Sequence, residues 1–334
     1  MGVIYFKGVE RVEKRDVIVR FKYRSNVNNF LNILSKQRTL LILIVTSIII
    51  SFLIPSFLTT NNLLNLLRQV SINGIIAVGM TFVIATGGID ISVGSSLALG
   101  GVVVGLCLKM GVSVLVSIII ALLVTFCAGL LNGVIVAYGH VLPFVATLGT
   151  MYVFRGITLI ISRGQAIWGL PSSFIQIGTG YIFDIPIPVI IMLSIYILGW
   201  LLLKFFTFGR HVLGIGGNEE AARLCGVSVQ RVKMFTYGLS GILCGTAGVI
   251  LAARLGSAQP SVGTGYELSA IAACVIGGNS LIGGKGTIFG TLLGVLILGV
   301  ISNALNLWGV ASFFQTVITG CIVLLTVLLD AIKK

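Results

Sequence analysis

The chain carries too few charged residues to cover the surface of a soluble protein of its length. Only 9% of its 334 residues are Asp, Glu, Lys or Arg, whereas soluble domains contain about 25%. Hydrophobic residues make up 57%, and 43 glycines accompany them. Lipid must therefore cover much of the surface, and small residues let membrane helices approach one another closely. The sequence predicts an all-α polytopic membrane protein.

The apolar residues fall into segments long enough to cross a membrane, which takes about 20 residues each. We expect about ten transmembrane helices, near 39–57, 70–86, 92–108, 112–134, 142–162, 186–206, 234–253, 267–278, 287–304 and 310–330. Between the first two segments, an amphipathic helix is expected at Thr59–Gln69, along the outer interface.

Two of these segments are short and end in glycine pairs followed by polar residues. The second ends in Ala85–Ser96, ATGGIDISVGSS, and the eighth ends in Val275–Thr287, VIGGNSLIGGKGT. Paired segments interrupted by glycine are the best sequence indication of a transport site. Both are expected on the same side of the membrane, so they do not predict an inverted repeat.

The positive charge of the chain indicates its orientation. Nine of the 22 Lys and Arg lie in residues 1–38, which is typical of a cytoplasmic flank. Ten crossings from there return the C-terminus to the cytoplasm and leave few basic residues outside, namely Arg68, Lys109, Arg163 and Arg254. The net charge of +13 therefore reflects topology and not a nucleic-acid partner.

One long polar loop, 207–233, interrupts the apolar sequence on the cytoplasmic side. It contains a short helix with marked ends, because Asn218 can cap its first turn and Gly226 can supply a left-handed residue after its last. Such a helix is either part of a solvated loop with no further role or a surface on which another protein acts. The residues assigned to that coupling surface are Asn218, Glu219, Glu220, Arg223 and Gly226.

Asp90 and Arg155 are ionisable residues within apolar sequence, where charges are costly and normally pair or face a cavity. We expect them to pair or to face an aqueous path; alternatively, both extend to helix ends as topology markers. Phe144 and Thr147 are candidates to line the same path, or to pack. The remaining polar candidates from the two interrupted segments are Ser92, Asn279 and Ser280.

Several kinds of chemistry have no sequence support. The six cysteines and two histidines show no metal-ligand spacing, and no catalytic residues or cofactor site are predicted. A phosphate-binding loop is also excluded, because Lys285 is followed by Gly286 where that motif requires Ser or Thr. If ATP drives this protein, another chain binds it.

Four stretches resemble the ribose-type sugar permeases of bacterial ABC importers, in the same order along the chain. They are GMTFVIATGGIDISVGS (79–95), LPFVATLGTMYVFRG (142–156), GGNEEAARLCGV (216–227) and GYELSAIAACVIGGNSLIGGKGTIFGTLLG (265–294). The resemblance extends from about residue 28 to the end. One departure is Ser269, which stands where such permeases usually carry an acidic residue after GYEL.

The resemblance implies that residues 39–334 form a permease domain in the bacterial inner membrane, with both termini cytoplasmic. Its partners would be a cytoplasmic ATP-binding subunit, an extracytoplasmic sugar-binding protein, membrane lipid and a second copy of the chain. The cargo would be a monosaccharide, most simply ribose or a related pentose. The coupling helix of these permeases matches Asn218–Gly226, and the Asp of their GGID motif matches Asp90.

Two alternatives remain at this point. An ion-coupled secondary sugar transporter would use Asp90 as its proton or sodium site and would need no ATPase. A membrane enzyme ranks third, because the sequence contains no visible nucleophile–base pair. The sequence leaves open the identity of the sugar, including galactose or a signalling furanose, and the number of ATPase chains.

Overall fold

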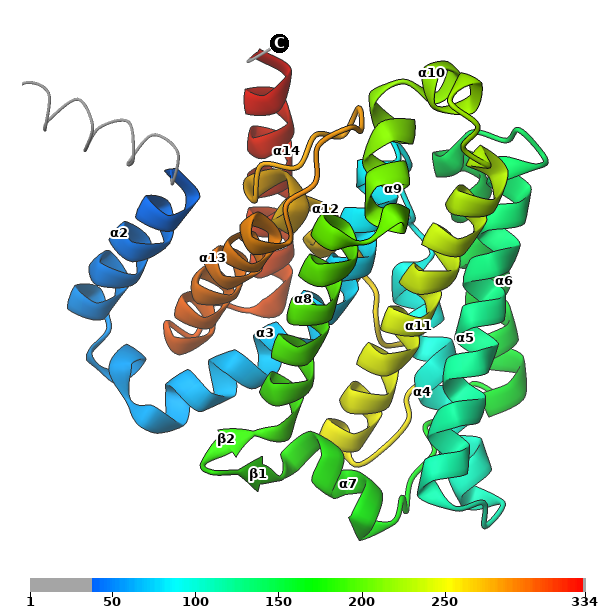
Figure 1. The fold of residues 1–334 in the computed structure, drawn as a ribbon. Coiled ribbons are helices and arrows are strands. Elements are labelled where there is room, and N and C mark those ends of the chain that lie inside the picture. Colours follow the sequence, from blue (N-terminus) through cyan, green and yellow to red (C-terminus); the bar gives the residue numbers. More distant parts are fainter. Residues whose placement is uncertain (1–37, 333–334) are drawn as a thin grey trace, which may run out of the picture.

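The computed structural model of the chain describes residues 38–332, so the basic segment assigned to 1–38 lies almost wholly outside the described residues. The described part is a helical bundle with one short hairpin (Figure 1). Its elements are α2 (Arg38–Leu53), η1 (Pro55–Leu58), α3 (Thr60–Ala85), α4 (Val93–Lys109), α5 (Val114–Ala137), α6 (Pro143–Ser162), α7 (Ser172–Thr179), β1 (Tyr181–Ile182), β2 (Ile185–Pro186), α8 (Ile187–Phe205), α9 (Thr207–Gly217), α10 (Glu219–Leu224), α11 (Val229–Leu255), α12 (Tyr266–Ile276), α13 (Ile288–Leu307) and α14 (Ser312–Ile332).

Six helices within residues 38–332 are long and apolar enough to cross a membrane, which confirms an all-α membrane protein. They are α3, α5, α6, α8, α11 and α13. Shorter apolar helices lie at α2, α4, α12 and within α14. Each expected segment therefore coincides with a helix, while the count of ten crossings stays a prediction.

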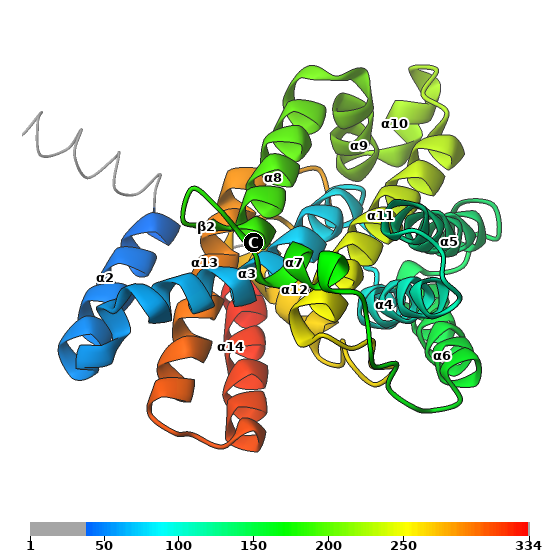
Figure 2. The same ribbon diagram turned by 90° about the horizontal axis from the view of Figure 1, so that it is seen from below.

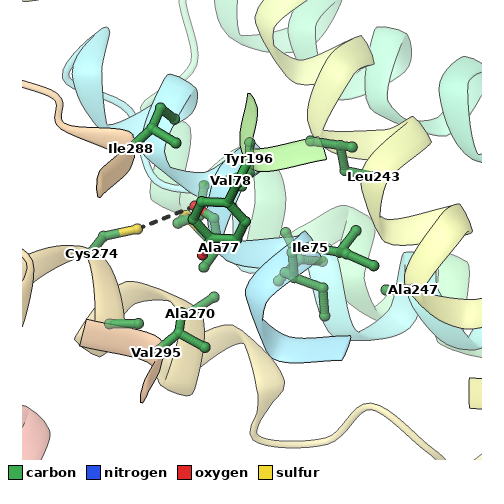
Figure 3. Close-up of a cluster of buried hydrophobic side chains, with 14 of the residues drawn as sticks. Ile75, Ala77, Val78, Tyr196, Leu243, Ala247, Ala270, Cys274, Ile288 and Val295 are labelled. Carbon is green, nitrogen blue, oxygen red and sulfur yellow. Dashed lines mark hydrogen bonds between the residues drawn. The ribbon is translucent and has the colours of Figure 1, made fainter. Parts of the chain in front are cut away.

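Helices α3 and α11 form the centre of the bundle. Figure 2 shows α4, α5 and α6 grouped beside α11, whereas α2, α13 and α14 lie toward the opposite side of the molecule. Glycines allow the close packing around α11: a Cβ on Gly241 would overlap the carbonyl oxygen of Thr125 in α5. The core at α3 is apolar: Figure 3 shows Ala77 and Val78 beside Tyr196, in the cluster that also contains Leu243.

The helix expected at Thr59–Gln69 is present, but it is continuous with the next segment, because α3 runs without a break from Thr60 to Ala85. No proline or glycine pair interrupts residues 60–73, so nothing in the sequence ends the helix there. The polar residues at its start are used for packing. Asn62 and Asn303 exchange two amide hydrogen bonds of 2.9 Å and so join the start of α3 to the end of α13.

The two ends of the bundle carry different structures. Helix α10 lies at one end, together with the C-terminal end of α14, and α7 with the β1–β2 hairpin lies at the other (Figure 1). The connection between α6 and α8 therefore contains a short helix and a hairpin. Arg68 connects this layer to α3, because its guanidinium lies 4.5 Å from the Tyr181 ring centroid and donates to the Thr179 carbonyl.

Candidate functional site

The two glycine-interrupted segments lie side by side at the α10 end of the bundle. The α3–α4 loop, residues 86–92, follows the last turn of α3, and the α12–α13 loop, residues 277–287, follows α12. The backbone N–H of Gly284 in the second loop donates to the carbonyl of Ala85, just before the first, at 3.1 Å. The expected placement on one side is therefore confirmed, and the two loops form one candidate site.

Asp90 organises the α3–α4 loop through a buried hydrogen-bond network. Its side chain is only 2% exposed. One carboxylate oxygen accepts from the backbone N–H and hydroxyl of Ser92, at 3.0 and 2.6 Å, and the other accepts from the Ser240 hydroxyl at 3.1 Å. The Asn132 amide in turn donates to the Ser92 hydroxyl at 2.7 Å. The carboxylate thus joins its own loop to α11, and Ser92 extends the network to α5.

The predicted pairing of Asp90 with Arg155 is wrong. Arg155 instead donates to the backbone carbonyls of Pro260 and Val262, at 2.8 and 2.6 Å. The cause is that hydroxyl and backbone donors already satisfy Asp90, while the chain before α12 brings free carbonyls to Arg155. Arg155 also lines a cavity of about 170 Å³, and the other lining residues are Ser95, Met151, Tyr152, Thr264 and Glu267. The alternative expectation for Arg155, that it faces a path, remains compatible with this position.

Thr147 and Phe144 occupy different environments on α6. Thr147 is fully buried, and its hydroxyl accepts from the Ile91 N–H at 3.1 Å, so it fastens the α3–α4 loop to α6. Phe144, in contrast, is 53% exposed at the first turn of α6. Thr147 therefore contacts the α3–α4 loop at the residue after Asp90, whereas Phe144 lies at the protein surface.

Asn279 closes the α12–α13 loop. Its carbonyl oxygen accepts from the Thr287 N–H at 2.6 Å, and its amide donates to the Thr291 hydroxyl at 2.7 Å. Thr291 and Thr81 are hydrogen-bonded at 2.7 Å, so this loop is fastened to α3. Ser280 lies next to Asn279, half-buried, where its backbone carbonyl accepts from Gly283.

The polar partners of these residues were missed from sequence. Asn132 is a lone amide in the strongly apolar α5, and that contrast is a usable signal, because polar groups in membrane helices seek partners. Ser240, Thr81 and Thr291 have no such signal, since hydroxyls can also bond to their own helix backbone. Ser269 uses its hydroxyl in this way, on the Gly265 carbonyl at 3.0 Å.

The capped helix expected in the polar loop is present as α10. The Asn218 side chain accepts from the Ala221 N–H at 2.9 Å, and Gly226 has a φ of 82° in a Schellman motif. Glu219 joins α10 to α11 through Lys233 at 2.6 Å. The most exposed charged side chains of α10 are those of Glu220, 70% exposed, and Arg223, 49% exposed. Two features were missed from sequence. They are α9, which precedes Asn218, and Leu224, which is 82% exposed at the end of α10.

Replacing Asn218 with alanine is expected to destabilise α10 by about 1 kcal/mol, because the first turn loses its cap. The Ala221 amide should then exchange with solvent roughly fivefold faster, as measured by hydrogen exchange with mass spectrometry. Asn218→Asp is the control, since it keeps an acceptor oxygen and adds negative charge at the helix start. Equal exchange rates in all three proteins would show that the cap does not hold α10.

The chain is similar to known transport proteins over most of its length. Residues 62–327 match the family model described as branched-chain amino acid transport system / permease component. The chain is 49% identical to the ribose import permease protein of Bacillus subtilis over 308 residues, which cover 92% of this chain and 96% of that one. It is 46% identical to the Escherichia coli ribose import permease protein (90% and 95% covered) and 38% identical to the E. coli D-allose transport system permease protein (90% and 93% covered). No solved structure matches.

Proposed function

Because this chain belongs to the branched-chain amino acid transport system / permease component family, we propose that it is the membrane-spanning subunit of an ATP-driven ribose importer. The observation that supports ribose most is the 45–49% identity to ribose import permease proteins over about nine-tenths of the chain. The allose and L-arabinose permeases are 38–39% identical. The subunit moves its cargo and leaves ATP hydrolysis to a partner.

The partners of such a subunit are a cytoplasmic ATP-binding protein, an extracytoplasmic sugar-binding protein and a second copy of this chain. With α10 in the cytoplasm, both termini lie there as well, and ten helices cross the inner membrane. The exposed side chains of α10 are the surface for the ATP-binding protein. The hairpin end, where Phe183 is 95% exposed and Trp168 is 61% exposed, is the surface for the sugar-binding protein.

The transport cycle proposed here is alternating access. The ATP-bound partners close, displace α10 and open the path outward to the sugar-binding protein; hydrolysis resets the path inward. Asp90, Ser92, Thr147 and Asn279 hold the two loops at the cytoplasmic end of this path, since their polar groups bond within the protein. Arg155, which lines a cavity, and the exposed Phe144 are the members of the set placed to meet solute.

Reconstitution tests this function directly. The permease, its ATP-binding subunit and its sugar-binding protein are placed in liposomes, and labelled ribose uptake is measured with and without ATP. Uptake that needs all three proteins and ATP, and that excess D-allose or L-arabinose reduces little, is the expected result. Uptake by the permease alone, driven by a proton or sodium gradient, would instead establish the ion-coupled alternative at Asp90.

A further inference from the structure

The last turn of α9 lies directly over the hydrogen bond that joins the two loops of the site. A Cβ on Gly216 would overlap both the carbonyl oxygen of Ala85 and the backbone nitrogen of Gly284, which are the acceptor and the donor of that bond. Only a residue without a side chain fits this position. The segment that carries α10 is thus in backbone contact with both loops at once.

The loops also contact each other and α9 through further glycines. A Cβ on Gly283 would lie 2.8 Å from the nitrogen of Gly87 and 2.9 Å from the Cα of Gly216. Gly283 and Gly284 have φ values of 98° and 73°, and Gly87 has 80°, all in the left-handed region that favours glycine. We call the set of Ala85, Gly87, Gly216, Gly283 and Gly284 the glycine junction.

The α3–α4 loop and the α12–α13 loop each lead from the glycine junction into a buried polar network. Gly87 precedes Asp90 in the loop that Ser240 and Thr147 fasten to α11 and α6. Gly283 belongs to the loop that Asn279 closes and that Thr291 fastens to α3. Backbone contacts without intervening side chains are stiff, because close-packed atoms have no rotamers through which to yield.

We propose that the glycine junction transmits the displacement of α10 to both interrupted segments, so that α9, α10 and the two loops move as one body. This inference rests on the proposed function and adds the contact through which the ATP-binding subunit would act on the path. Gly216 is a positioning residue in this scheme, because it contacts the loops and not the solute.

The test is Gly216→Ala in the reconstituted complex, with Gly214→Ala as the matched control. Both glycines lie on α9 and neither has a positive φ, but a Cβ at Gly214 meets open space. The Gly216→Ala complex is expected to hydrolyse ATP within twofold of the unmodified complex and to import at least tenfold less ribose per ATP. Normal uptake per ATP in Gly216→Ala would overturn the proposal, whereas failure of ATP-driven uptake in the unmodified and Gly214→Ala complexes would instead refute the proposed function.

A cross-link tests the same idea if Gly216→Ala does not assemble. In a Cys225→Ser background, cysteines replace Gly217 and Lys285, which are both exposed and flank the junction from α9 and from the α12–α13 loop. A short bis-maleimide is expected to join them and to leave at least half of the uptake, because the two segments move together. Absence of the cross-link would show that the segments separate. The same conclusion would follow if cross-linking abolished uptake while labelling of the single Gly217→Cys variant did not.

Discussion

Replacing Asp90 with alanine is expected to lower the free energy of unfolding by at least ~2 kcal/mol and to abolish most ribose uptake. The substitution leaves the Ser92 N–H and the hydroxyls of Ser92 and Ser240 without their acceptor in a buried site, and each such group costs about 1–3 kcal/mol. The Ser92 N–H has the fewest alternatives, since it lies at the start of α4. Denaturant unfolding in detergent, combined with uptake in liposomes, measures both effects.

Graded variants separate this explanation from a general effect of lost charge. Asp90→Asn keeps an acceptor oxygen for Ser92, and Ser240→Ala removes only one of the hydrogen bonds, so both should lie between Asp90→Ala and the unmodified protein. Asp184→Asn removes a carboxylate from the exposed turn between β1 and β2 and should change stability by less than about 0.5 kcal/mol. If Asp90→Ala is as stable as Asp184→Asn, the carboxylate does not hold the loop.

Reversing the exposed charges of α10, with Glu220→Arg and Arg223→Glu together, is expected to reduce ATP-driven uptake at least tenfold. Both side chains project into solvent and pair only weakly with their own helix, at 3.9 Å, so folding depends little on them. Like charges brought together across a protein interface cost several kcal/mol, and every 1.4 kcal/mol is a factor of ten in affinity. Uptake and the ribose-stimulated ATPase rate of the reconstituted complex are the measurements.

The control for this pair is Arg231→Glu, which changes an exposed charge in the first turn of α11, outside α10. It should reduce uptake less than twofold. All variants should reach the membrane in equal amounts, because α10 is joined to α11 through Glu219 and Lys233, which stay unchanged. Uptake that withstands the double reversal would mean that the ATP-binding subunit acts on another surface.

The sequence predicted those parts of the site in which the interacting residues are close together along the chain. Asn218 caps a helix whose N–H is three residues away, and Gly226 ends the same helix, so composition and spacing sufficed. The positions of the transmembrane segments could also be predicted, because the length of an apolar stretch largely decides them. The helix expected at Thr59–Gln69 is the start of the longer α3, and no local signal in the sequence indicates that its Asn62 bonds to Asn303.

Contacts between segments that are distant along the chain could not be predicted from the sequence. Charge alone favoured Arg155 as the partner of Asp90, yet Ser240, 150 residues away, supplies a donor instead. Hydroxyls are too common in membrane helices to identify one partner among many. The position of Gly216 over the bond between Ala85 and Gly284 depends on three segments meeting, and a lone glycine in sequence indicates nothing about which backbone approaches it.

The central claim is that α10 faces the cytoplasm and contacts the ATP-binding subunit there, and the natural Cys225 reports on both. It is exposed directly after α10. In sealed vesicles, a membrane-impermeant maleimide should label Cys225 in inside-out but not in right-side-out preparations, relative to a Cys225→Ser control. Added ATP-binding subunit should then protect it. Labelling from the outer side, or equal labelling with and without the ATP-binding subunit, would contradict the account.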